Sequence, residues 1–400
     1  MKSDTDFSHC GRLLIEFANK WKAVIFLVFT TILALLLREN FRSYESKDYI
    51  FDFLPWCRYL EGNGGFKGII SIQSDYPVSY LYFLALFTFV PFTYLTEIKL
   101  LSVAFDFLAA FFVFKIVKKA RNDVAGSFIP YLAFAVSLFI PTIVMNGAIW
   151  AQCDIIYVAF ILISLYCLME EKFPLAFVFF GLALSFKLQA IFLIPVYIWL
   201  YFKLAKLSLL NFLIVPIVYF LIYIPAVLLG KPVSGLFATY TTQVTEYKSL
   251  VKNFANLYSF LPDDYDLFFA GGVILGLTVV GIFTLLIIMD EYVRAHPKTI
   301  IEVAMLSVML STYFLPAMHE RYMFAADLLA VIYLFLNPKR FYIPLIIWFI
   351  NANCYMPFLY DRDPWMSFEI LAILNLAVQV ILLIDLFGLS GGRRAARESM

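Results

Sequence analysis

A few ionisable side chains, set among long apolar runs, are the residues of this sequence that could do chemistry. They are four carboxylates, a histidine and two cations, namely Asp48, Asp52, Asp154, Glu320, His319, Lys187 and Arg321. An aspartate beside a bound hydroxyl can act as a general base, and the fork of an arginine suits the oxygens of a phosphate. An ionisable group inside an apolar span costs about 2.5–3.5 kcal/mol on insertion scales, so each of these residues is a candidate for function.

Each candidate also has a plainer structural interpretation. Asp48 and Asp52 are compatible with solvated loop residues or helix caps, and Lys187 with a lysine whose ammonium group reaches the membrane interface. Glu320 could simply neutralise Arg321. We favour function for the run that ends at Arg321, because three consecutive ionisable residues between two apolar stretches are harder to explain by structure alone.

Two further segments add polar candidates. Gln152 stands two residues before Asp154, and Asp154 could either pair with a cation from another span or position a ligand. In the 230–266 segment, Tyr247 and Asn253 offer neutral hydrogen bonds of the kind that hold sugar hydroxyls. Polar residues are common in loops, so this second signal is weak.

A proline predicts where the chain near Asp48 becomes helical. Proline is favoured at the first position of a helix, because its missing N–H would have no intrahelical partner there. We therefore expect a helix to begin near Pro55 and Asp48 to lie in the preceding loop. From such a loop a carboxylate can reach a hydroxyl bound in a neighbouring cavity.

The composition requires a membrane. Of the 400 residues, 63% are hydrophobic and 15% are charged, whereas a soluble domain carries roughly 25% charged residues. Uncharged apolar runs such as 23–37, 129–145 and 267–289 approach or exceed the ~20 residues of a spanning helix. The net charge of +1 removes any general argument for nucleic-acid binding, and the scattered cysteines indicate neither a zinc site nor a disulfide framework. We expect an all-α polytopic membrane protein.

The distribution of lysine and arginine predicts how many stretches cross the bilayer, because positive residues accumulate on the cytoplasmic side. If 76–95 lies in the outer interface, both termini are cytoplasmic and 18 of the 30 Lys and Arg residues lie inside. If 76–95 crosses as well, only 11 lie inside. We therefore expect twelve transmembrane helices, at 22–37, 98–117, 128–145, 153–169, 174–187, 188–202, 208–229, 267–289, 299–315, 322–336, 341–357 and 366–389.

This topology gives a single integral-membrane domain over residues 1–400 with two substantial external loops. The first external loop, with an interfacial juxtamembrane helix, covers 38–97, and central helices cover 98–229. The second external loop covers 230–266, and C-terminal helices cover 267–400. Loops longer than about 15 residues in a compact protein are usually functional. The ionisable candidates all fall on the external side, where acid, base and cations can converge on a charged substrate.

Seven short motifs, spread from residue 46 to residue 322, carry a family resemblance. They are Ser46-x-Asp48-Tyr49, Phe53-Leu54-Pro55-Trp56, Gly64-Gly65-Phe66, Tyr76-Pro77, Trp150-x-Gln152-Cys153-Asp154, Ser185-Phe186-Lys187-Leu188-Gln189-Ala190 and Met318-His319-Glu320-Arg321-Tyr322. With them the chain resembles the GT-C superfamily of membrane glycosyltransferases. Within it, the chain looks most like the bacterial mannosyltransferase family related to the glycosylphosphatidylinositol mannosyltransferases.

The resemblance implies an inverting transferase that moves a sugar from a polyprenyl-phosphate donor to a hydroxyl of a cell-envelope glycan or glycolipid. The active site would face outward from a bacterial cytoplasmic (inner) membrane. Asp48 matches the position of the general base, and Asp52 is the reserve candidate. The donor phosphate would be held by Arg321 and Lys187 with help from His319. The residues that would support the acceptor or the sugar are Asp154, Gln152, Glu320, Tyr247 and Asn253. No metal or other cofactor is required, because the leaving group is a stable phosphate and the base is a side chain.

One departure and two alternatives accompany this interpretation. Lys47 stands where the resemblance leads us to expect a small residue, often glycine, so that a cation would lie beside the base. A lipid-linked sugar flippase or transporter would need a similar outer cavity, but also polar residues along the inner half of the bundle, which here looks almost uniformly apolar. A catalytically inactive subunit of an envelope-polysaccharide complex would not need intact acidic and basic positions.

Overall fold

The computed structural model describes residues 9–122, 126–236 and 248–389, and 77% of these residues are helical. All twelve apolar stretches expected from the sequence are helical, most with boundaries shifted by a few residues, although the first helix begins 13 residues earlier, at His9, and the 128–145 stretch is bent. Within the described residues the only strands are β1 (Val251–Lys252) and β2 (Met318–His319), which pair with each other. The expectation of an all-α membrane protein is therefore confirmed at the level of fold class.

The helices keep close to the order of the apolar runs. They are α1 (His9–Glu39), α2 (Leu54–Gly62), α3 (Val78–Phe87), α4 (Tyr94–Arg121), α5 (Ile129–Phe139), α6 (Pro141–Val144), α7 (Asp154–Met169), α8 (Phe173–Phe186), α9 (Ile194–Lys203), α10 (Ile214–Leu229), α12 (Tyr265–Met289), α13 (Pro297–Phe314), α14 (Phe324–Leu336), α15 (Tyr342–Tyr360) and α16 (Phe368–Phe387). Two π-helical turns, η1 (Tyr49–Phe53) and η3 (Met145–Ile149), lie next to the candidate site.

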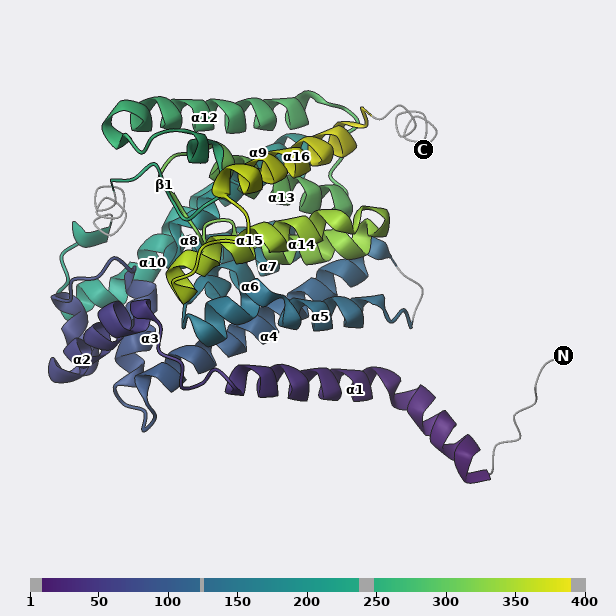
Figure 1. Cartoon of the computed structure of the whole chain (residues 1–400), viewed down its shortest axis with the longest axis horizontal. Helices are drawn as coiled ribbons and strands as arrows, with labels where there is room; N and C mark the ends of the chain where they lie inside the picture. The colour runs from purple at the N-terminus through teal and green to yellow at the C-terminus, as the bar shows by residue number, and fades with distance from the viewer. Residues whose placement is uncertain (1–8, 123–125, 237–247, 390–400) are drawn as a thin grey trace.

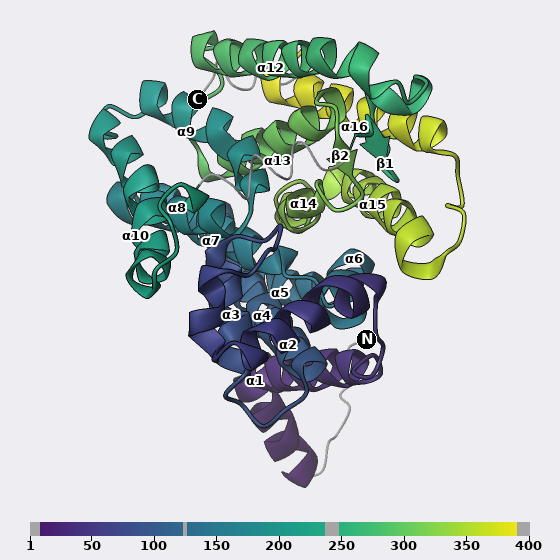
Figure 2. The same cartoon turned by 90° about the vertical axis from the view of Figure 1, so that its left-hand side faces the viewer.

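Helix α7 lies at the centre of the bundle. It packs against α4 and α8, while α13 packs against α12, α14 and α16. Figure 2 shows α14 nearly end-on, with α7, α13 and α15 around it. Of the 16 residues of α7, 14 are buried, which explains why its sequence is apolar on every face and not along one stripe.

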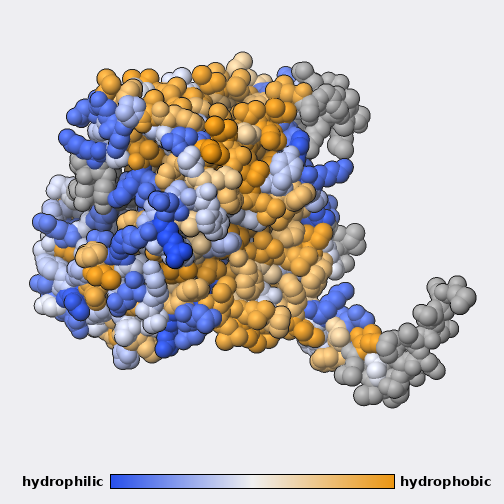
Figure 3. Space-filling model, viewed as in Figure 1, coloured by the Kyte–Doolittle hydropathy of each residue, from blue (hydrophilic) through white to orange (hydrophobic). Residues whose placement is uncertain are grey.

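Polar and apolar residues divide the surface into two zones. Figure 3 shows hydrophilic residues gathered at one end of the molecule and a broad hydrophobic surface over the middle of the helices. The hydrophilic end, which we call the polar end, carries α2, α3 and β1, whereas α1 begins and α16 finishes at the opposite end (Figure 1). An exposed apolar surface of this extent fits contact with lipid and not with water.

Six helices are long and apolar enough to cross a membrane, and a seventh crossing follows if the bent pair of α5 with 141–149 is counted as one span. The two parts of that pair meet at 51°. Five shorter apolar helices fall below the same length. The described residues are therefore consistent with a polytopic membrane protein that has six or seven candidate long spans, and the expected number of twelve stays a prediction.

A buried ion pair attaches α1, whose apolar stretch is only 11% buried, to the bundle. The Nη2 and Nε atoms of Arg38 lie 2.8 Å and 2.9 Å from Oδ2 of Asp106 on α4. Both side chains are at most 4% exposed. Because breaking a buried pair leaves an uncompensated charge, this contact fixes the start of the first loop beside α4.

The prediction for the first loop is right about α2, which begins at Leu54 with Pro55 in its first turn, and wrong about the residues before α2. Residues 47–62 are continuously helical, so Asp48 lies in the first turn of a helix and not in a loop. Ser46 caps this helix, since its Oγ accepts the N–H of Tyr49 at 3.2 Å. Pro55 falls inside the helix, directly after the wide turn η1, where a missing N–H is accommodated.

Candidate functional site

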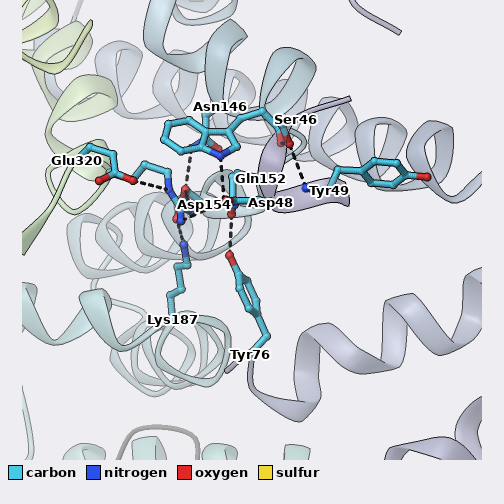
Figure 4. Close-up of polar contacts among 11 residues, drawn as sticks. Ser46, Asp48, Tyr49, Tyr76, Asn146, Gln152, Asp154, Lys187 and Glu320 are labelled. Atoms are coloured by element: carbon cyan, nitrogen blue, oxygen red, sulfur yellow. Dashed lines mark hydrogen bonds and ion pairs between the residues drawn. The ribbon is translucent and has the colours of Figure 1, made fainter. Parts of the chain in front are cut away.

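Six of the seven ionisable candidates line one pocket at the polar end, although they come from widely separated segments, and Asp154 contacts two of them. The pocket is lined by the first loop, the turn before α7, the end of α8, β1 and the turn after β2. Its ionisable and polar lining residues include Asp48, Asp52, Asp75, Tyr76, Gln152, Lys187, Lys252, His319, Glu320 and Arg321. Figure 4 shows how the side chains around Asp48 and Asp154 point toward one another.

Three donors approach the same oxygen of the Asp48 carboxylate. Nε1 of Trp150 lies 2.9 Å from Oδ2, Nη2 of Arg321 lies 3.6 Å from it, and Nε2 of Gln152 donates to it. No donor to Oδ1 is found among the described residues. The donors therefore stabilise the negative charge through Oδ2, while Oδ1 is available to accept a proton from a molecule in the pocket.

The turn between η3 and α7 brings Trp150 and Gln152 to the same carboxylate. Ala151, between them, has a positive φ of 62°, a conformation that a non-glycine residue keeps only where its surroundings impose it. Here the carbonyl of Trp150 accepts Oγ of Ser46 at 2.6 Å, and the carbonyl of Gln152 accepts Oγ of Ser102 at 2.7 Å. The turn is thus held from the first loop and from α4.

The amide of Gln152 bridges Asp48 and Tyr76. Its Oε1 accepts a hydrogen bond from the Tyr76 hydroxyl at 2.7 Å, which directs its Nε2 toward Asp48. Burial holds the pKa of Tyr76 well above its ordinary value, so the hydroxyl keeps its proton and remains a donor. Tyr76 therefore fixes the orientation of one of the three donors to Asp48.

Asp154 joins two cations of the site, Lys187 and Arg321. Its Oδ1 accepts Nζ of Lys187, and its Oδ2 lies 3.2 Å from Nη1 of Arg321 and accepts Nδ2 of Asn146 at 2.7 Å. The Asp154 side chain is 2% exposed. As the first residue of α7, it also lies where the helix dipole favours a carboxylate. The pairing with a cation from another span, one of the two roles considered from sequence, is present.

Arg321 lies between the two aspartates. Burial acts to lower the pKa of Arg321, but Asp154, with Tyr76 and Asp48, holds it well above its ordinary value, so the guanidinium stays charged. Its Cζ also lies 4.9 Å from the centre of the Trp150 ring, a favourable cation–π distance. Its Nε is 4.0 Å from Oε1 of Glu320. Asp154 is therefore a closer ionic partner of Arg321 than Glu320 is.

His319 lines the pocket as a neutral imidazole. Burial, followed by the charges of Arg321, Lys252 and Lys187, lowers its pKa to about 3. It can thus offer a hydrogen bond but not a positive charge. Burial has the opposite effect on the neighbouring acid, since it raises the pKa of Glu320.

The sequence analysis also considered Lys47, Asn253 and Tyr247. Lys47 does not point a cation at the base, because its ammonium group pairs with Asp361 and lies 5.9 Å from the centre of the Phe358 ring. Asn253 is not among the residues that line the pocket. Tyr247 falls in 237–247, outside the described residues.

Sequence reasoning missed Lys252, Asp75 and the role of Trp150. Lys252 enters the pocket from the second loop next to the expected Asn253, and Asp75 enters from the segment before α3. A signal was present for Trp150, which belongs to the same motif as Gln152. No local signal marked Lys252, because its place depends on strand pairing with a distant segment.

Neither the known protein-family models nor the curated proteins contain a match to this chain. The site must therefore be interpreted from its own chemistry. Within 9–122, 126–236 and 248–389, no three His, Cys, Asp or Glu side chains gather as metal ligands would. The pocket combines an aspartate whose contacts all reach one oxygen, three cations and a neutral histidine, which together can take a proton and hold an anion.

Proposed function

We propose that this protein is an inverting membrane glycosyltransferase of the GT-C type. A hydroxyl of a cell-envelope glycan or glycolipid attacks the anomeric carbon of a polyprenyl-phosphate-linked sugar, and its proton passes to Asp48. The bond from that carbon to the phosphate oxygen breaks, and the electron pair leaves with the phosphate. A single displacement of this kind inverts the configuration of the sugar.

The observation that carries the proposal is the position of Asp48 beside Arg321 in one pocket. A general base and a charged group that stabilises a leaving anion must both reach the reacting carbon. Arg321, Trp150 and Gln152 all contact Oδ2 of Asp48, and no donor among the described residues contacts Oδ1. The carboxylate is thus contacted at one oxygen and has another with which to accept a proton.

The cations support departure of the phosphate. In the donor the phosphate is a diester with one negative charge, and in the released polyprenyl phosphate it carries more charge. Arg321 and Lys187 are held in place by Asp154 before any ligand binds, so they stabilise this developing charge without first having to be ordered. His319 adds a hydrogen bond. The transfer as written has no step that needs a metal.

We place the site on the outer side of a bacterial cytoplasmic membrane, with twelve crossings and cytoplasmic termini. Helices α7 and α8 have 16 and 14 residues, about 24 Å and about 21 Å at 1.5 Å per residue. Both are shorter than the ~30 Å hydrocarbon core, so neighbouring turns that are buried in protein would complete these crossings. The α3 helix would lie in the outer interface.

A transfer assay tests this function. Purified protein in nanodiscs would receive a panel of radiolabelled polyprenyl-phosphate sugars and a membrane glycolipid extract, with and without chelator. We expect label to move from one donor into the extract, to the same extent in both conditions. No transfer from any donor, combined with movement of donor lipid between leaflets, would instead indicate the flippase alternative.

A further inference from the structure

The second loop enters the pocket through a short parallel strand pair. Val251 pairs with Met318, and Lys252 pairs with His319. Residues directly opposite each other on neighbouring strands point to the same face, and both Lys252 and His319 line the pocket. The pairing therefore places an ammonium group from the second loop beside the imidazole of the β2 turn.

Buried hydrogen bonds fix the strand pair from both sides. The N–H of Ala317 donates to the carbonyl of Leu250 at 2.7 Å. Beyond β1, Nδ2 of Asn256 donates to the carbonyl of Thr312 at 3.2 Å, and Nδ2 of Asn375 on α16 donates to the carbonyl of Ala255 at 3.0 Å. Both asparagines are fully buried. The backbone that carries Lys252 is thus tied to α13 and α16.

Lys252 enters the pocket from a different side than the other two cations. Lys187 and Arg321 both contact Asp154, and Arg321 also contacts Asp48. The ammonium group of Lys252 lies 5.9 Å from the centre of the Phe358 ring, on the side of the pocket formed by β1 and β2. The low pKa of His319 agrees with a positive potential there.

We propose that Lys252 is a third phosphate-binding cation, which the β1–β2 pair sets beside His319 and Arg321 to hold the phosphate of the polyprenyl donor. The inference rests on the proposed function and adds to it that the second loop binds the donor directly. Lys252 brings a further positive charge to the side of the pocket that carries His319 and Arg321. It therefore adds to the attraction of an anion, and more strongly for the released monoester.

A binding experiment tests this assignment on the full chain in detergent. The probe is undecaprenyl phosphate in mixed micelles, with undecaprenol as the lipid that lacks the phosphate. Lys252→Gln removes the charge, Lys252→Met removes it while keeping an apolar chain against Phe358, and Lys252→Arg keeps it. Lys248→Gln is the matched control, because Lys248 lies in the same loop and is exposed.

We expect the wild type to prefer the phosphate lipid to the alcohol. Lys252→Gln and Lys252→Met should each weaken binding of undecaprenyl phosphate about 10-fold or more, as for loss of a charge-assisted hydrogen bond. Lys252→Arg and Lys248→Gln should bind nearly as the wild type does. Melting temperatures close to that of the wild type would show that the variants fold.

Two results would overturn the assignment, and they can be told apart. If the charge-removing variants bind undecaprenyl phosphate as tightly as the wild type, Lys252 is not part of the phosphate site, while the proposed donor class stands. If the wild type binds the alcohol as well as the phosphate lipid, both the proposed donor class and the role of Lys252 are wrong.

Discussion

The indole N–H of Trp150 donates to Asp48 across 2.9 Å, and the same ring lies 4.9 Å from the guanidinium carbon of Arg321. One side chain thus orients the carboxylate that we propose as base and supports the cation that we propose for the phosphate. Trp150 lies in the turn before α7. Its carbonyl group accepts a hydrogen bond from Ser46 of the first loop, which holds the turn in place.

Replacing Trp150 by phenylalanine tests the hydrogen bond separately from the ring. Trp150→Phe keeps an aromatic surface for Arg321 but removes one of three donors to Asp48. We expect kcat/KM for transfer to fall about 10-fold, the cost of one hydrogen bond to a charged group. Steady-state kinetics with the labelled donor would measure this. A variant as active as the wild type would show that the indole N–H does not support the base.

Gln152 should be more sensitive to added charge than to lost polarity. Gln152→Glu places a second carboxylate against Asp48 and against the hydroxyl of Tyr76, so the like charges repel. Gln152→Leu removes the bridge without adding charge. We expect transfer to fall about 100-fold in the first variant and about 10-fold in the second. Equal losses would indicate that Gln152 matters only for packing.

Asp154 should be important for stability as well as for activity. Asp154→Asn leaves Lys187 and Arg321 without their shared buried counter-ion. Breaking a buried ion pair in this way typically lowers the free energy of unfolding by about 3–5 kcal/mol. We expect a clearly lower melting temperature in detergent. Glu171→Gln is the control, because Glu171 pairs with Lys206 in an exposed ion pair, and such pairs contribute about 1 kcal/mol or less. Similar effects of the two substitutions would contradict the role of Asp154 as a buried anchor.

His319 should make the protein less stable in mild acid. The pKa of His319 is about 3 in the folded protein and about 6.5 in an unfolded chain. Below pH 6.5 the unfolded chain therefore binds a proton that the folded protein does not, and stability falls with falling pH toward pH 3. Between pH 6.5 and pH 5 this amounts to about 2 kcal/mol.

The matched variant isolates this effect from the other acidic groups. His319→Gln keeps a neutral hydrogen-bonding side chain but cannot take up a proton. We expect its melting temperature to fall less than that of the wild type when the pH is lowered from 7 to 5. Identical pH dependence in the two proteins would show that His319 titrates normally and is not held neutral by its surroundings.

The helices of this protein could be predicted from the sequence, because burial in lipid and protein leaves continuous apolar runs. Helix α7 is an example, since nearly every residue from Ile155 to Met169 is apolar and buried. The prediction near Pro55 was right for α2, which begins at Leu54, but wrong for Asp48, which lies in a helical turn and not in a loop. The missed signal was Ser46, because serine is a preferred N-cap residue and the structure uses it as one.

The site could be predicted only in part. Asp48, Lys187 and Arg321 stood out because charge is rare in this chain, and the structure brings them into one pocket. Lys252 did not stand out, because a two-residue pairing with His319 leaves no periodic pattern in either segment. The sequence also could not show that Asp154 pairs with both Lys187 and Arg321, because that depends on distances between side chains that residue spacing does not give.

The central claim is that Asp48 accepts the proton of the acceptor. It is tested most directly by comparing transfer rates of wild type, Asp48→Asn and Asp52→Asn in nanodiscs, with melting temperatures to show that each folds. Asparagine is nearly the same size as aspartate and cannot act as the base. We predict that Asp48→Asn loses transfer by about 1,000-fold or more, within the range of general-base catalysis, while Asp52→Asn retains most of it. Near-wild-type transfer by Asp48→Asn, with loss in Asp52→Asn, would contradict the account and move the base to Asp52.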